Sequence, residues 1–197
     1  MVRNLIYVLS VFLLTSCLDS NSPLSDPMKA KPDKALTGSW RMDDNGDTTY
    51  FHVGLPKGKL AENFLHVVQV DLQKNSGALK KIEYLMFTTS VGKQQYLNLK
   101  LLEDGELVKM ELSEKPPVLE NFVLFRYEQK GDSISLLALD IDYLKSAVSA
   151  KKIQGEVNQI GTPKLTEGTE KLAAFFAKEG DKVFPKKKSP LIVKRIR

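Results

Sequence analysis

Short segments in which apolar and polar residues alternate, separated by turn residues, constrain the fold of this chain most. A period of two is typical of antiparallel strands that bury one face. We count roughly eight or nine such segments between residues 48 and 196. The chain should therefore be mainly β. A meander of this length closes into a barrel or packs as a sandwich, because both arrangements remove exposed strand edges, and we favour the barrel.

The same alternation predicts which side chains share a face. One face of residues 64–72 carries Phe64, His66, Val68, Val70 and Leu72, and one face of residues 94–101 carries Leu97, Leu99 and Leu101. Asp104-Gly105 predicts a tight hairpin, because a type I′ turn needs a positive φ at both central positions. The strand after this turn would contain Val108, Met110 and Leu112.

Two stretches depart from the period of two and predict helices, a short one at residues 141–150 and a longer one at residues 167–178. In the longer one, Leu172, Phe175 and Phe176 are spaced to share one helical face, which we expect to pack on the sheet. Thr166 is placed to cap the start of this helix, and Gly180 follows its predicted end.

Composition and motifs exclude several activities. One Cys forms no internal disulfide and no Cys-based zinc site, and two His residues leave little for a His-rich metal site. His52 and His66 fall in predicted strands, where histidines are usually structural. Nucleophile-elbow, P-loop, dinucleotide and H-E-x-x-H motifs are absent from the sequence. We therefore predict a protein that is not an enzyme and uses no metal or other cofactor.

The N-terminus carries a targeting pattern. Arg3 precedes an apolar run at residues 5–14, which is too short to span a bilayer at about 1.5 Å per residue. The run ends in Leu14-Thr15-Ser16-Cys17, which resembles the lipobox of bacterial lipoproteins. This resemblance implies that residues 1–16 are a signal peptide, that cleavage falls between Ser16 and Cys17, and that Cys17 carries acyl chains such as palmitate that hold the protein at the membrane.

The residues after Cys17 refine the expected location. Leu18 stands where lipoproteins retained in the inner membrane typically have Asp, so the resemblance implies the periplasmic face of the outer membrane in a Gram-negative cell envelope. Residues 18–35 contain three Pro and many Ser, Asp and Lys without periodicity. We interpret residues 17–35 as the lipidated Cys and a flexible tether with a reach of about 20–25 Å, and residues 36–197 as a single β-barrel domain with a basic C-terminal tail.

The start of this domain suggests a family. Gly38 and Trp40 form a Gly-x-Trp pattern at the first strand, and residues 96–99 and a late helix follow. This arrangement resembles lipocalin-like barrels, and the mature chain resembles uncharacterised lipocalin-like bacterial lipoproteins. The resemblance implies structural roles for Gly38 and Trp40 and an antiparallel barrel of about eight strands. The interior of such a barrel either holds one small ligand or is filled by its own side chains.

The positive charge of the chain gathers at its C-terminus. Residues 178–197 hold eight basic residues and two acidic ones. Such a cluster either contacts an anionic surface or is simply solvated. The candidate contacts are Lys186, Lys187, Lys188, Lys194, Arg195 and Arg197. We do not expect a nucleic-acid partner, because aromatic residues do not interleave with this cluster.

Two functions remain open. In the first, a lipid-anchored barrel binds a small apolar or amphipathic ligand. In the alternative, the barrel is a solid scaffold for envelope assembly, and its surface and basic tail bind an envelope protein or the cell wall.

Overall fold

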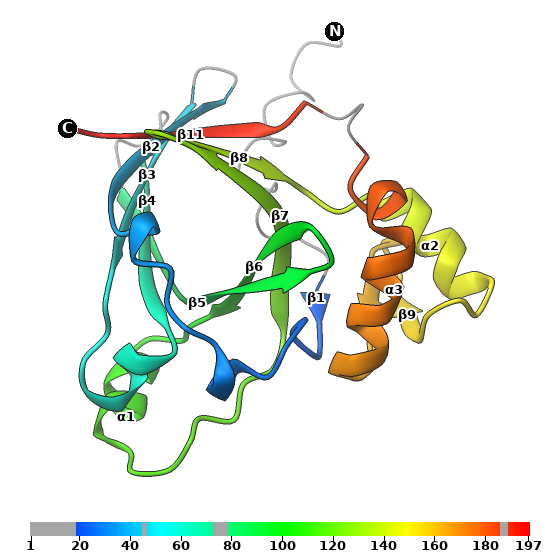
Figure 1. The fold of residues 1–197 in the computed structure, drawn as a ribbon, viewed down its shortest axis with the longest axis horizontal. Helices are drawn as coiled ribbons and strands as arrows, with labels where there is room; N and C mark the ends of the chain where they lie inside the picture. Colours follow the sequence, from blue (N-terminus) through cyan, green and yellow to red (C-terminus); the bar gives the residue numbers. More distant parts are fainter. Residues whose placement is uncertain (1–18, 45–46, 73–78, 186–188) are drawn as a thin grey trace, which may run out of the picture.

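In the computed structural model, which describes residues 19–44, 47–72, 79–185 and 189–197, eight antiparallel strands close into a barrel (Figure 1). Each strand pairs with the next along the chain, and the last strand, β11, pairs with both β8 and β2 to complete the ring. The predicted barrel is thereby confirmed. The barrel strands are β2 (Gly38–Asp44), β3 (Asp47–Gly54), β4 (Leu65–Leu72), β5 (Leu79–Val91), β6 (Gln94–Leu101), β7 (Phe122–Lys130), β8 (Ser133–Leu137) and β11 (Leu191–Arg195).

A second layer lies against the outside of the barrel, to one side in Figure 1. It contains α2 (Ile141–Ser149), β9 (Gly155–Val157), β10 (Pro163–Leu165) and α3 (Thr169–Val183), all inserted between β8 and β11. The short β1 (Asp19–Ser20) joins this layer to the barrel, because it pairs with β7 on one side and β10 on the other. Both predicted helices are present.

The ends of α3 differ from the prediction. Gly168, and not Thr166, occupies the N-cap position, and the helix continues to Val183. Gly180 therefore lies within the helix, where a Cβ atom would lie 3.1 Å from the Tyr96 hydroxyl. The absence of a side chain at Gly180 lets α3 approach β6 closely.

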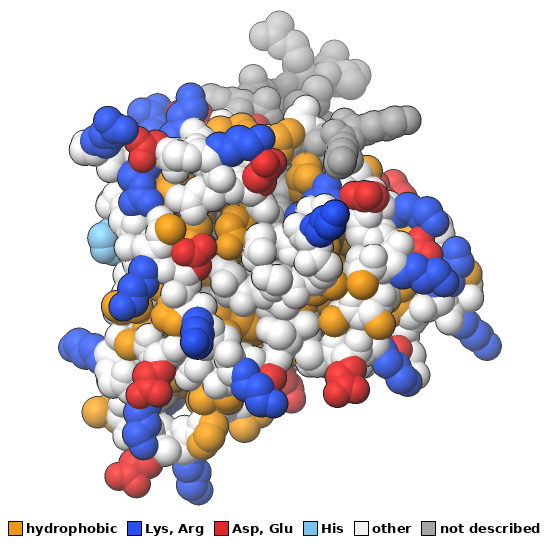
Figure 2. Space-filling view, viewed as in Figure 1, with side chains coloured by type: hydrophobic (Ala, Val, Ile, Leu, Met, Phe, Trp, Pro, Cys, Tyr) orange, Lys and Arg blue, Asp and Glu red, His pale blue; other side chains and the backbone are white. Residues whose placement is uncertain are grey.

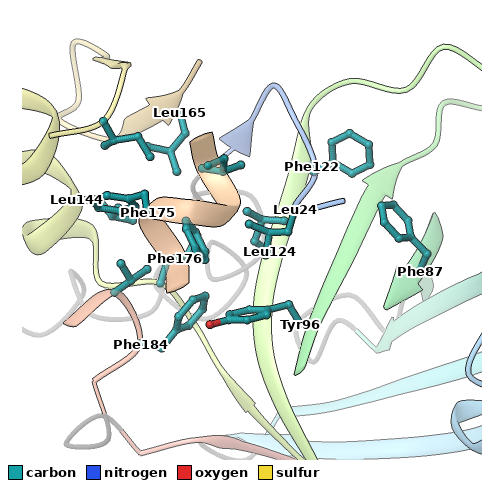
Figure 3. Packing of buried hydrophobic residues seen from close by; sticks show 14 of the residues in the cluster. Leu24, Phe87, Tyr96, Phe122, Leu124, Leu144, Leu165, Phe175, Phe176 and Phe184 are labelled. Atoms are coloured by element: carbon teal, nitrogen blue, oxygen red, sulfur yellow. The ribbon is translucent and has the colours of Figure 1, made fainter. Parts of the chain in front are cut away.

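The protein has two apolar cores. The inner core lines the inside of the barrel and includes Trp40, Leu65, Val67 and Phe125. The outer core lies between β5, β6, β7 and the second layer (Figure 3), where the aromatic rings of Tyr96, Phe176 and Phe184 pack together. The expected packing of Phe175 and Phe176 on the sheet is confirmed.

Because the outer core covers part of the barrel's exterior, some strands bury both faces. The side chains that the alternation groups on one face of β4 do share that face, but it points outwards. Leu65, Val67 and Gln69 are buried and point inwards, whereas His66, Val68 and Val70 are only half-buried on the other face. Apolar residues on both faces make the phase of the alternation ambiguous.

The strand predicted after Asp104-Gly105 is also wrong, because this segment forms α1 (Glu106–Leu112). Gly105 does adopt a positive φ of 75°, but it is the N-cap of the helix. Leu107 and Met110, spaced by three residues, pack against the outer core. α1 also contacts η3 (Gly58–Glu62). Glu111 of α1 accepts a hydrogen bond from the backbone N–H of Lys57, the residue just before η3.

The structure differs from the flexible tether expected before residue 36. From Asp19 onwards the chain packs along the barrel, with the two short helical turns η1 (Pro27–Lys29) and η2 (Lys34–Leu36). The side chain of Leu24 is 2% exposed, and the amide of Asn63 donates to the carbonyls of Met28 and Ala30. Residues 1–16, which are expected to be a signal peptide, and Cys17 lie outside the described residues.

Candidate functional site

The barrel encloses a cavity of about 100 Å³ whose wall is almost entirely apolar. Every barrel strand contributes two side chains spaced by two residues, as the alternation of strand side chains requires. The wall is formed by Leu36, Trp40, Met42, Phe51, Val53, Val67, Gln69, Tyr84, Met86, Leu97, Leu99, Val123, Phe125, Ile134, Leu136, Leu191 and Val193.

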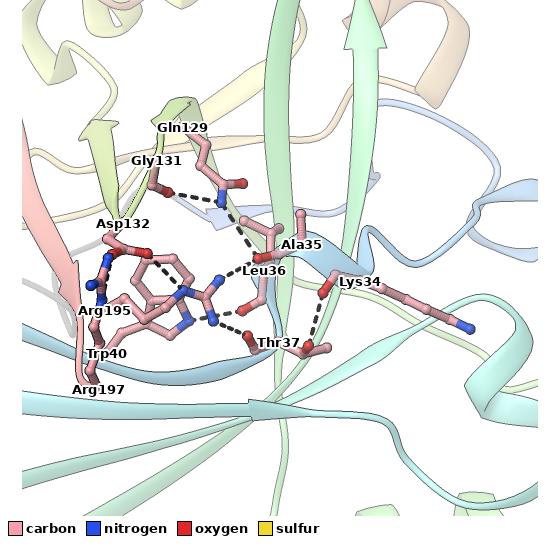
Figure 4. A network of polar contacts seen from close by, with 10 residues as sticks. All are labelled: Lys34, Ala35, Leu36, Thr37, Trp40, Gln129, Gly131, Asp132, Arg195 and Arg197. Atoms are coloured by element: carbon pink, nitrogen blue, oxygen red, sulfur yellow. Dashed lines mark hydrogen bonds and ion pairs between the residues drawn. The ribbon is translucent and has the colours of Figure 1, made fainter.

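One end of the barrel is closed by the segment that leads into β2. Leu36 is buried beside Trp40, whose indole N–H donates a 2.8 Å hydrogen bond to the Leu36 carbonyl. The Arg195 guanidinium stacks over the Trp40 ring at 4.2 Å from the ring centroid. It also donates hydrogen bonds of 2.6 Å to the carbonyls of Ala35 and Thr37 (Figure 4). Arg195 thus ties the first and last barrel strands to η2.

Gly38 belongs to the same closed end. Its φ is +126°, and a Cβ atom would lie 2.5 Å from a nitrogen of the Arg195 guanidinium. Gly38 therefore provides both an unusual backbone conformation and the space in which Arg195 reaches η2.

Polar side chains on β3, β4 and β5 lie close to one another on the inner side of the barrel. We call Thr49, Gln69, Asp71 and Tyr84 the polar cluster. The Tyr84 hydroxyl donates to the Gln69 carbonyl oxygen at 3.1 Å, and the Gln69 amide donates to both Asp71 oxygens at 3.1 and 2.9 Å. The Thr49 hydroxyl donates to Asp71 at 2.8 Å. Gln69 and Tyr84 bring this cluster to the cavity wall.

The polar cluster was missed by the sequence interpretation. Gln69 lies two residues after the buried Val67 and therefore on the same inward face. It is 2% exposed although its side chain is polar. With the correct phase of β4, a polar residue at an inward position would have marked it as a candidate, because buried polar groups require partners.

Tyr127 provides a further buried hydroxyl, which donates to Asp33 at 3.3 Å. Burial first, and then the Asp33 carboxylate, raise the pKa of Tyr127 to about 12. The hydroxyl therefore stays neutral at physiological pH and serves as a hydrogen-bond donor.

The predicted basic contacts do not form one exposed group among the described residues. Arg195 is committed to the closed end, and the Arg197 guanidinium pairs with Asp132. Lys194 is exposed, and Lys186, Lys187 and Lys188 lie outside the described residues. On the face shown in Figure 2, Lys and Arg side chains are interspersed with Asp and Glu.

The two histidines lie on neighbouring strands, β3 and β4. His52 lies 3.1 Å from the Ser39 hydroxyl, whereas the nearest carboxylate to His66 is that of Glu83, at 3.8 Å. Burial is the main cause that lowers the pKa of His66. Across the ranges that the structure describes, no three His, Cys, Asp or Glu side chains come together as a metal site. None of the helices in these ranges is long and apolar enough to cross a membrane.

The fold and cavity define a small closed antiparallel barrel with an apolar interior. Comparisons with protein-family models, curated proteins and solved structures find no match to this chain. The antiparallel barrel of about eight strands is therefore shown by the structure alone, and no family is assigned to the chain.

Proposed function

We propose that this protein is a membrane-anchored lipoprotein whose barrel binds a small apolar or amphipathic ligand. The observation that carries the binding function is the cavity itself, to which all eight strands contribute apolar side chains and to which Gln69 and Tyr84 present polar groups. Small-molecule sites typically combine a mostly apolar wall with a few placed polar groups.

The cavity volume limits the ligand. About 100 Å³ is less than the roughly 150 Å³ of an engineered apolar cavity that binds benzene. The cavity therefore suits a short or branched hydrocarbon group, or the end of a longer chain. An amphipathic ligand would place a hydroxyl or amide beside Gln69, whose carbonyl oxygen has a second lone pair besides the one that Tyr84 uses.

The same volume sets the expected affinity. Burial of each methylene contributes about 0.8 kcal/mol, so four contribute about 3 kcal/mol. A dissociation constant of about 1 mM corresponds to about 4 kcal/mol. We expect affinities near this value for short ligands, with a contribution of about 1 kcal/mol from a hydrogen bond to the polar cluster.

The anchor rests on the lipobox resemblance at residues 14–17, and it implies the cell envelope, with the periplasmic face of the outer membrane in a Gram-negative cell. The alternative function, a scaffold that binds an envelope protein through the basic tail, stays a prediction. Two of its candidate contacts, Arg195 and Arg197, already bind groups of the barrel.

Native mass spectrometry and calorimetry with linear alcohols of increasing chain length test the binding function. We expect affinity to rise with chain length until the cavity is full. Val67→Phe, which fills the cavity from its wall, should abolish binding. Val68→Phe, on the other face of the same strand, should leave it unchanged. Absence of binding at millimolar alcohol, or equal binding by both variants, would contradict the proposal.

A further inference from the structure

The first described residues hold the N-terminus firmly on the barrel. Asp19 pairs with Val123 of β7, and Ser20 pairs with both Phe122 of β7 and Leu165 of β10. Ser20 is fully buried. The chain is therefore part of the sheet from Asp19 onwards.

Cys17 precedes Asp19 by two residues. A chain spans at most about 3.6 Å per residue, so the Cα atoms of these residues are no more than about 7 Å apart. Acyl chains on Cys17 would therefore bring the bilayer surface directly to β1. No flexible tether after Asp19 keeps the barrel away from the lipid, because the chain is already paired in the sheet there.

The pairing of β1 shows which part of the protein lies nearest. β1 is parallel to β10, so both strands begin at the same edge of the sheet. The turn that precedes β10 therefore lies on the side from which the chain enters β1. Lys164 of β10 is close enough to Asp19 to lower the pKa of its carboxyl, against the larger rise caused by burial.

This turn displays an apolar side chain at its tip. Ile160 is 83% exposed, and Val157 at the start of the turn is 44% exposed. The Asn158 side chain accepts hydrogen bonds from the backbone N–H groups of Ile160 and Thr162, at 3.1 and 2.8 Å. Its own backbone N–H donates to the Thr162 carbonyl at 3.0 Å. The exposed isoleucine is thus held in place by a defined turn.

Positive charge surrounds the turn. Residues 145–164 contain four lysines and one glutamate. Lys145 lies beside the turn, because a Cβ atom on Gly161 would be 3.1 Å from its amine. Lys151 is exposed at the end of α2. Basic residues at the surface attract anionic lipids, and an exposed apolar side chain at their centre suits the headgroup region.

We infer that Lys145, Lys151, Val157 and Ile160, which we call the anchor-side surface, rest on an anionic phospholipid bilayer with Ile160 inserted between the headgroups. This inference rests on the acyl anchor in the proposed function and adds the orientation of the barrel. Several acyl chains already attach a protein stably, so the basic surface adds the orientation of the barrel and is not needed for attachment itself.

The test uses the mature lipidated protein in phosphatidylethanolamine–phosphatidylglycerol vesicles. Acylation consumes Cys17, the one Cys of the chain, so an introduced cysteine is the sole free thiol. Ile160→Cys carries an environment-sensitive fluorophore. Tyr50→Cys is the matched control, because Tyr50 is 43% exposed on β3, four strands from β7 around the barrel. We expect a blue-shifted emission and several-fold weaker iodide quenching at position 160, and no change at position 50.

Mass spectrometry of the N-terminal peptide distinguishes a wrong orientation of the barrel from a missing acyl anchor. Acylated Cys17 with both fluorophores in water, or with both equally protected, would overturn the orientation and leave the anchor standing. An unacylated Cys17 would overturn both. Lys145→Glu with Lys151→Glu should restore quenching at position 160, whereas Lys57→Glu with Lys59→Glu, an equal change of charge on the connection between β3 and β4, should not. Equal effects of both pairs would overturn the lysine contact.

Discussion

The backbone N–H of Leu24 donates a 2.8 Å hydrogen bond to the side-chain oxygen of Asn98, which lies 74 residues later in the chain. Asn98 is fully buried, and its amide donates to the Thr89 hydroxyl at 2.9 Å. Thr89 in turn bonds to Ser25 at 2.6 Å. These bonds fasten the N-terminal segment to β5 and β6.

Replacement of Asn98 should therefore destabilise the protein. Asn98→Leu leaves a buried N–H and a buried hydroxyl without this partner, and we expect the free energy of unfolding to fall by about 2 to 3 kcal/mol. Urea denaturation measures this change. Gln94→Leu, at an exposed position on the same strand, is the control and should change the free energy by less than about 0.5 kcal/mol.

Removal of the N-terminal segment should be costly for the same reason. A chain that begins at Lys34 loses β1 and the buried Leu24. We expect it to unfold at lower urea concentration than a chain that begins at Asp19. Equal midpoints and slopes would show that residues 19–33 contribute nothing to stability.

Gly38 should not tolerate a side chain. Gly38→Ala places a Cβ atom against the Arg195 guanidinium and forces a positive φ on alanine, at a cost of roughly 2 kcal/mol. Gly54→Ala, on the strand paired with β2, meets no atom within 4 Å and should be neutral or slightly stabilising. Fluorescence of Trp40, the one tryptophan of the chain, reports unfolding of both variants.

Alkaline pH should weaken the closed end. The pKa of Tyr127 is about 12 in the folded protein and about 10 in an unfolded chain. Its stabilising contribution is therefore complete below about pH 10 and is lost as the pH rises towards about 12. Denaturation at a series of alkaline pH values should show a smaller loss for Tyr127→Phe. The pKa of Tyr143 is also about 12, so Tyr143→Phe is measured in the same way. If both variants lose stability with rising pH as steeply as the wild-type protein, the raised tyrosine pKa values do not cause the loss.

Gln69 should govern selectivity for polar ligands. Gln69→Leu removes the cavity-wall carbonyl that accepts from Tyr84, so a ligand hydroxyl loses its partner. We expect the preference for butanol over butane to fall about fivefold, which corresponds to about 1 kcal/mol. Competition binding measures the ratio. Because the variant also leaves Asp71 with fewer donors, its stability is measured in parallel by urea denaturation.

The features that could be predicted from the sequence are those encoded by local periodicity. Alternation predicted the barrel, and the spacing of Leu172, Phe175 and Phe176 predicted α3. What failed depends on contacts between distant residues. The composition around Leu24 is that of a linker, and contacts with distant residues such as Asn98 and Thr89 make it part of the fold. Similarly, a count of the basic residues in the tail treats Lys194 and Arg195 as equivalent. Because Val193 points inwards, the alternation of β11 places Lys194 outside and Arg195 on the inner face.

The position of β11 has a consequence for biosynthesis. β11 fills the gap between β8 and β2, yet residues 191–195 are translated after both of those strands. Until they emerge, β8 and β2 each present an unpaired edge that can recruit another chain. This strand order delays closure of the ring until residues 191–195 are available. A chain that stops before residue 191 would thus yield an open, aggregation-prone sheet.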